Sequence, residues 1–149
     1  MLRLVPLVLL LVVTTPALAL TPEQARVRVD HHLQHAEQLV GHFEMLLGMS
    51  CPQFPTTSAW DVYVDREADQ MTLLMAHLEQ AWVEAKRTGD DDVRRAAKAP
   101  RRHSDQMRQL MDKLTICAAA NGAAFSPVDV WRRVERDVPR RQTEIALPQ

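Results

Sequence analysis

The residues best suited to chemistry lie in one stretch, residues 29–51, which contains four of the chain's six histidines. At about 100° per residue in a helix, three of these histidines fall on one flank, and an amide and two thioethers continue the same band. The band consists of His31, His35, Gln38, His42, Met45 and Met49. The fourth histidine, His32, points instead to the edge of an apolar stripe on the same helix.

The spacing of the band predicts a metal site. His31 and His35 are four residues apart, so their imidazoles can bind one ion, whereas His42 lies almost two turns further on and belongs to a second site. Imidazole and thioether ligands in an exported protein favour copper or zinc. The first hypothesis is therefore a copper- or zinc-binding helix with His31, His35 and His42 as ligands. The alternatives are an exposed histidine face without a ligand and a face on which a partner docks.

A second candidate site follows Pro100. His103 precedes Met107 by one helical turn, and the two could act as haem or soft-metal ligands between this region and the first helix. A histidine at the edge of the core is the alternative. The chain contains no CxxCH, so covalent attachment of a c-type haem is excluded. Haem binding here would be noncovalent.

Enzyme motifs are absent from the chain. It contains no GxSxG, HExxH, P-loop or GxGxxG pattern, so no catalytic residue is predicted and a non-enzymatic role is favoured. Scattered glutamates, among them Glu67 and Glu84, are expected off the apolar stripes. His77 is also expected to be exposed.

Composition narrows the class of protein. The formal net charge is -1 and 25% of residues are charged, which argues against a nucleic-acid partner or a polybasic membrane role. The hydrophobic content is 46%, but aromatic residues make up only 5%. A core of leucine, alanine, valine and methionine is typical of packed helices.

The N-terminal segment predicts export. One arginine precedes a short apolar run, and Ala17-Leu18-Ala19 matches a cleavage site, so residues 1–19 are expected to be a cleaved signal peptide. The apolar run is too short to span a membrane, which takes roughly 20 residues. We expect a periplasmic or secreted domain of residues 20–149 with no stable membrane span after cleavage.

The two cysteines support that compartment. In an oxidising environment Cys51 and Cys117 are expected to form a disulfide. Binding of a metal by the two thiolates is the weaker alternative, because the chain has no CxxC motif.

Helical periodicity and end signals define the fold. We expect helices from Thr21 to about Met49, from the cap Ser58 to Thr88, over 91–98 and 101–120 with a break at Pro100, and from Ser126 to a stop or kink at Pro139. The predicted fold is an all-α up-and-down four-helix bundle with a broken third helix and one disulfide. Its expected function is non-enzymatic: a binding or accessory protein of the cell envelope that recognises an envelope protein or a small ligand.

Overall fold

The computed structural model describes residues 21–98 and 101–148, and in this part of the chain the fold is all-α, with five helices and no strand. The helices are α1 (Pro22–Gly48), α2 (Thr57–Thr88), α3 (Asp91–Ala97), α4 (Arg101–Ala120) and α5 (Pro127–Glu144). The all-α class is confirmed. Where four main helices were expected, the structure has five, because α3 and α4 are separate helices. The break itself, predicted at Pro100, lies outside the described residues.

The helix ends follow the local sequence. Thr21 and Gln24 form the predicted capping box at the start of α1, with Thr21 Oγ1 accepting from the Gln24 N–H at 3.2 Å. Gly89 ends α2 in the left-handed conformation, with a φ of 70°. The prediction that Ser58 caps α2 is wrong. Thr56 has the extended backbone of a cap and accepts the N–H of Ala59, so Ser58 lies in the first turn.

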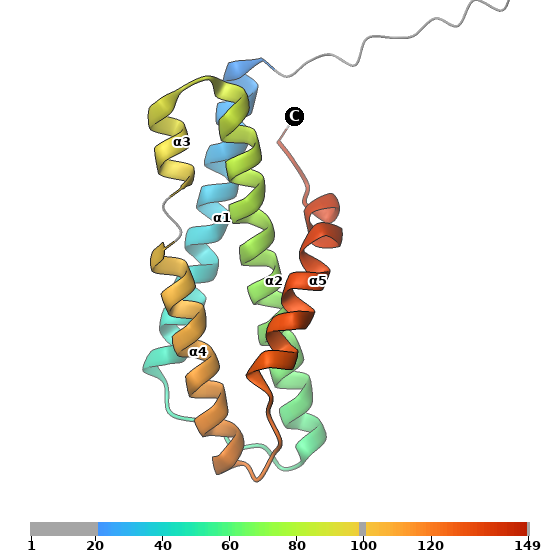
Figure 1. Ribbon diagram of the computed structural model, residues 1–149. Helices are drawn as coiled ribbons and strands as arrows, with labels where there is room; N and C mark the ends of the chain where they lie inside the picture. The colour runs from blue at the N-terminus through green and yellow to red at the C-terminus, as the bar shows by residue number, and fades with distance from the viewer. Residues whose placement is uncertain (1–20, 99–100, 149) are drawn as a thin grey trace, which may run out of the picture.

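The helices lie side by side along one long axis (Figure 1). α1 and α2 pack along their length, α4 packs on α1, α5 packs on α2, and α3 covers one end of the α1–α2 pair. The main core is built from large side chains of α1, α2 and α4, including Phe43, Trp60, Met71, Leu74, Leu110 and Leu114. Because α2 has neighbours on several sides, its buried surface is wider than one stripe.

A second, smaller core lies at the α3 end. Its buried residues are Val29, Ala81, Ala85 and Ala97, with Leu33, Trp82 and Val93 packed around them. Three of the four buried residues are alanines, so this core buries much less apolar side-chain surface than the main one.

The predicted disulfide is confirmed. Cys51, just after α1, is bonded to Cys117 of α4, at the end of the molecule opposite α3 (Figure 1). Asn121 fixes the same loop, since its side chain donates to the Pro52 carbonyl and accepts from the Phe54 N–H, both at 2.9 Å. In the part of the chain that the structure describes, none of the helices has the length and apolar character needed to cross a membrane.

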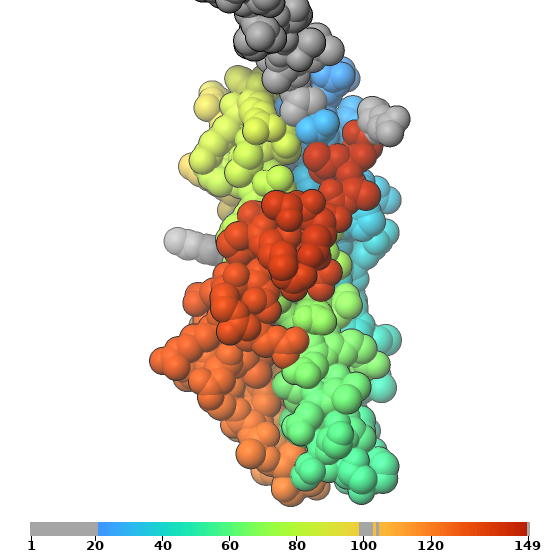
Figure 2. Space-filling model, turned by 90° about the vertical axis from the view of Figure 1, so that its right-hand side faces the viewer, coloured from blue at the N-terminus to red at the C-terminus, as the bar shows by residue number. Residues whose placement is uncertain are grey.

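The last helix is longer than expected. Pro139 was expected to end or kink this helix. α5 continues through Pro139 to Glu144, so a stop at this residue is wrong. Packing of Val134 and Val138 in the main core holds this helix in place, and Ile145 after the helix packs on the same core. Figure 2 shows α5 lying across α2, with the segment after it reaching toward α1.

Replacing Gly41 and Gly89 by alanine is expected to change the stability of the protein in opposite directions. Gly41 is exposed inside α1 and Gly89 has a φ of 70°, and neither would place a new Cβ within 4 Å of another atom. Gly41→Ala should raise the free energy of unfolding by about 1 kcal/mol, because alanine is the better helix former. Gly89→Ala should lower it by about 1 kcal/mol, because the left-handed region strains a Cβ. Urea unfolding of both variants checks this prediction. A change in the free energy of unfolding with the same sign in both variants would contradict it.

Candidate functional site

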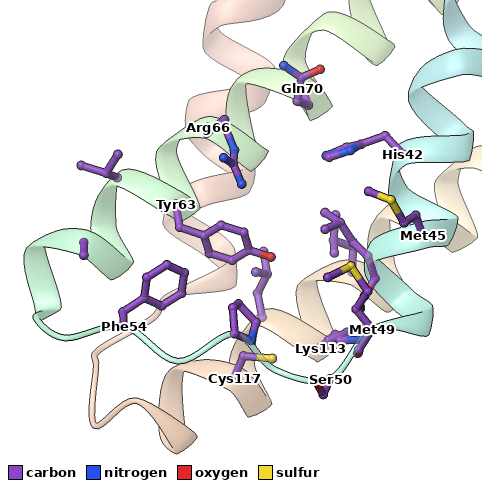
Figure 3. Close-up of a pocket in the computed structure, with 16 residues that line it drawn as sticks. His42, Met45, Met49, Ser50, Phe54, Tyr63, Arg66, Gln70, Lys113 and Cys117 are labelled. Atoms are coloured by element: carbon purple, nitrogen blue, oxygen red, sulfur yellow. Dashed lines mark hydrogen bonds between the residues drawn. The ribbon is translucent and has the colours of Figure 1, made fainter.

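A cavity of about 770 Å³ opens where α1, α2 and α4 meet near the disulfide (Figure 3). Met45 of α1 and Met49 just after it form one wall, and Phe54 and Tyr63 face them from the loop and from α2. Leucines of α1 and α4 and Cys117 complete the lining, together with residues of the loop after α1. The volume is in the range of pockets that hold small molecules.

Apolar side chains at this cavity are in contact with water. The exposed fractions are 55% for Met45, 54% for Met49 and 67% for Val62. Large apolar side chains gathered beside a cavity are typical of a ligand or partner site, because covering them removes hydrocarbon surface from water.

The polar groups of the lining are neutral or basic. They are Ser50, His42, Tyr63, Arg66, Gln70 and Lys113, and no acidic side chain lines the cavity in the described structure. Lys113 donates to the carbonyls of Leu46 at 2.6 Å and Leu47 at 2.9 Å, and also to that of Met49. These carbonyls lie at and just after the end of α1, where the helix supplies few partners, although that of Leu46 also accepts the N–H of the cap residue Met49 at 3.3 Å. Since all three ammonium N–H groups are used, Lys113 contributes charge to the cavity rather than a free donor.

On the other side of the cavity, the buried carboxylate of Glu67 holds two polar side chains in place. Glu67 Oε2 accepts from His42 Nε2 at 2.7 Å, and its Oε1 accepts from Nε and Nη2 of Arg66 at 3.0 and 2.9 Å. Glu67 has no exposed surface, so the expectation that it lies off the core is wrong. A fully buried charge needs such partners. The pairing fixes His42 and Arg66 at the cavity edge.

Arg66 and Tyr63 form the polar edge of α2. The Arg66 guanidinium carbon lies 5.4 Å from the centroid of the Tyr63 ring, and in Figure 3 both side chains point into the cavity. Burial, with a contribution from the Glu67 carboxylate, raises the pKa of the Tyr63 phenol, which therefore stays a hydrogen-bond donor. Glu67 uses one edge of the guanidinium, and Nη1 is left to face a ligand.

The predicted histidine band is divided between two places. His42, Met45 and Met49 line the cavity, with His42 held by Glu67 rather than near the other histidines. His31 and His35 lie together, with ring centroids 4.5 Å apart, beside His77 of α2. As the side chains stand in the described residues, no group of three or more histidine, cysteine, aspartate or glutamate side chains is placed to hold a metal ion.

Two histidines are buried, and for one of them, His77, this is against expectation. His32 is 0% and His77 4% exposed, and their Nδ1 atoms lie 3.0 Å apart. Burial, and then the neighbouring histidines, lower the pKa of each ring to about 4. The prediction that His77 is exposed is therefore wrong. Its distances of three residues from Leu74 and four from Ala81 place it on a buried face of α2.

The proposed haem ligands His103 and Met107 lie one turn apart on α4. Met107 is buried and lines a hollow between α4 and α5, which His103 and α1 do not line. The Nδ1 of His103 is buried and has no hydrogen-bond partner within the described structure.

A comparison with known protein families, with curated proteins and with solved structures finds no match to this chain.

Proposed function

We propose that this chain is an exported binding protein for a small amphipathic anion, that is, a molecule with an apolar body and one acidic group. The cavity at the disulfide end carries the proposal, because it combines an apolar wall with a basic edge. Export is supported by the predicted signal peptide over residues 1–19, and the Cys51–Cys117 disulfide suits an oxidising compartment.

The apolar body would lie against Met45, Met49 and Phe54. The two methionines are half exposed, and thioether side chains adapt to differently shaped apolar ligands. Covering this surface supplies most of the binding free energy, at roughly 25 cal/mol per Å² of apolar area. A protein partner would need a larger and flatter surface than this cavity provides.

The acidic group would meet Arg66. Arg66 and Lys113 carry two positive charges at the cavity, and the carboxylate of Glu67 behind the lining offsets one of them. A guanidinium binds a carboxylate or phosphate through paired N–H groups, which an alcohol cannot match. The site therefore distinguishes an alkyl acid from an uncharged molecule of the same length.

Calorimetric titration of the mature chain, residues 20–149, with decanoate and with 1-decanol tests this proposal. Arg66→Gln should weaken decanoate binding about tenfold and leave 1-decanol unchanged, because one charge-assisted hydrogen bond is lost. Met45→Ala/Met49→Ala should weaken both ligands by a similar factor, because the apolar wall is smaller.

Arg136→Gln is the matched control, since Arg136 is an exposed arginine of α5 paired with Asp137. It should bind both ligands as the unchanged chain does. Decanoate affinity weaker than about 1 mM in the unchanged chain would reject the proposal. Equal effects of Arg66→Gln on the acid and the alcohol would reject the role of the basic edge.

A further inference from the structure

Four histidines gather between α1 and α2, away from the cavity near the disulfide. His31, His32 and His35 come from α1, and His77 comes from α2. The His77 ring centroid lies 5.0 Å from that of His35, 5.2 Å from that of His32 and 6.2 Å from that of His31. Four imidazoles therefore gather in one region of the fold, and each has nitrogens that can bind a metal ion.

His32 and His77, the inner pair of the cluster, have the spacing of two ligands on one ion. The Nδ1 atoms of His32 and His77 are 3.0 Å apart. With metal–nitrogen bonds of about 2.0–2.1 Å, two nitrogens on one ion are about 2.9 Å apart at a right angle and about 3.4 Å apart at a tetrahedral angle. The observed distance lies within this range, so an ion could join the two rings with little backbone movement.

The hydrogen bond between His32 and His77 leaves one polar atom of the pair without a partner. A neutral imidazole has one N–H and one bare nitrogen, so only one of the two Nδ1 atoms donates to the other. Nε2 of His32 is buried and has no hydrogen-bond partner in the described structure. An ion bound at Nδ1 would leave Nε2 of the same ring as an N–H that still lacks a partner, so Nε2 of His32 is not one of the ligands.

The outer pair provides access. His31 and His35 are half-buried neighbours one turn apart, and with His77 they line a surface hollow of about 290 Å³. Ile145 and Ala146, which follow α5, border the same hollow. As the side chains stand, the nitrogens of His31 and His35 do not converge with those of the inner pair, so a four-histidine site requires both side chains to turn inward.

We infer that His31, His32, His35 and His77 form a binding site for one divalent transition-metal ion. His32 and His77 bind through Nδ1, and His31 and His35 complete the coordination by turning inward. Imidazole ligands suit zinc, nickel and copper, and Cu²⁺ should bind most tightly. This set keeps His31 and His35 from the sequence prediction, excludes His42 and adds two histidines.

Titration of the full mature chain with Zn²⁺ and Cu²⁺ tests the inference. We expect one ion per chain with a submicromolar dissociation constant. His31→Ala/His35→Ala should weaken binding at least tenfold, and His32→Leu/His77→Leu should weaken it at least a hundredfold. His103→Ala is the control, because it removes one imidazole outside the cluster and should leave the affinity unchanged. Unchanged affinity in His32→Leu/His77→Leu would overturn the inference and assign binding to the exposed pair alone.

A measurement on the unchanged chain keeps the test decisive if a variant fails to fold. In nitrogen NMR spectra of ¹⁵N-histidine-labelled protein, one equivalent of Zn²⁺ should shift the Nδ1 signals of both His32 and His77. Shifts confined to His31 and His35 would overturn the four-histidine site. Because the cluster and the cavity share no residue, Arg66→Gln should not change metal binding, so this inference and the proposed function can fail separately.

Discussion

Loss of the Cys51–Cys117 disulfide is expected to lower the free energy of unfolding by about 4 kcal/mol. The bond joins residues 66 positions apart, so in the unfolded chain it closes a loop that contains the residues of α2, α3 and most of α4. Reduction frees this loop and raises the conformational entropy of the unfolded state, while the folded helices keep their packing. The effect is a large share of the 5–15 kcal/mol by which proteins of this kind are stable.

Urea unfolding measures this difference directly. The oxidised chain, the chain with a thiol reductant and Cys51→Ala/Cys117→Ala should be compared at the same pH. The reduced chain and the double variant should agree with each other within about 1 kcal/mol, because both lack the cross-link and differ only in local packing. A loss smaller than about 1 kcal/mol would show that the helix contacts alone hold this end together.

Acidification is expected to destabilise the metal-free protein between pH 6.5 and pH 4. The pKa values of His32 and His77 are lowered from 6.5 to about 4 in the folded state, first by burial and then by neighbouring histidines. In this window the unfolded state binds more protons than the folded state, so the free energy of unfolding falls as the pH falls. Above pH 6.5 neither ring is protonated in either state, and this contribution is constant.

The size of the acid effect is on the order of 3 kcal/mol for one ring. The two rings are in contact, so their combined effect is less than twice this amount. Denaturant unfolding at several pH values, with a chelator present, measures it. His32→Leu/His77→Leu removes both partners together and should flatten the dependence in this window, whereas His103→Gln should not. A slope that is the same in all three chains would assign the acid sensitivity to other groups.

Much of the fold could be predicted because it follows from local rules. The capping box at Thr21, the left-handed Gly89 and the acidic start of α3 determine helix ends within a few residues. The pairing of Cys51 with Cys117 followed from the expected compartment. The length of α5 could not be predicted in this way, because tertiary packing of Val134 and Val138 outweighs the local effect of Pro139.

The candidate sites were only partly predictable, because they depend on which helix faces are covered. Glu67 and Glu84 were expected off the apolar stripes and His77 was expected to be exposed, yet all three are buried. Each lies three or four residues from an apolar residue of α2, so spacing contained the signal. The sequence does not reveal that α2 is the central helix, in contact with α1, α3 and α5. Because α2 packs against other helices on several sides, its buried residues extend beyond a single apolar stripe.

The unequal cores give the molecule a gradient of local stability. The disulfide, Trp60, Phe43 and the leucines of α4 close one end, whereas the other end rests mainly on alanines of α2 and α3. Partial opening should therefore begin at the alanine-rich end, with amide hydrogens of α3 and early α1 exchanging with solvent before those near the disulfide. The histidine cluster lies between the two cores, just after Val29 on α1 and just before Ala81 on α2. The cluster therefore lies at the boundary between the more stable end of the molecule and the end that is expected to open first.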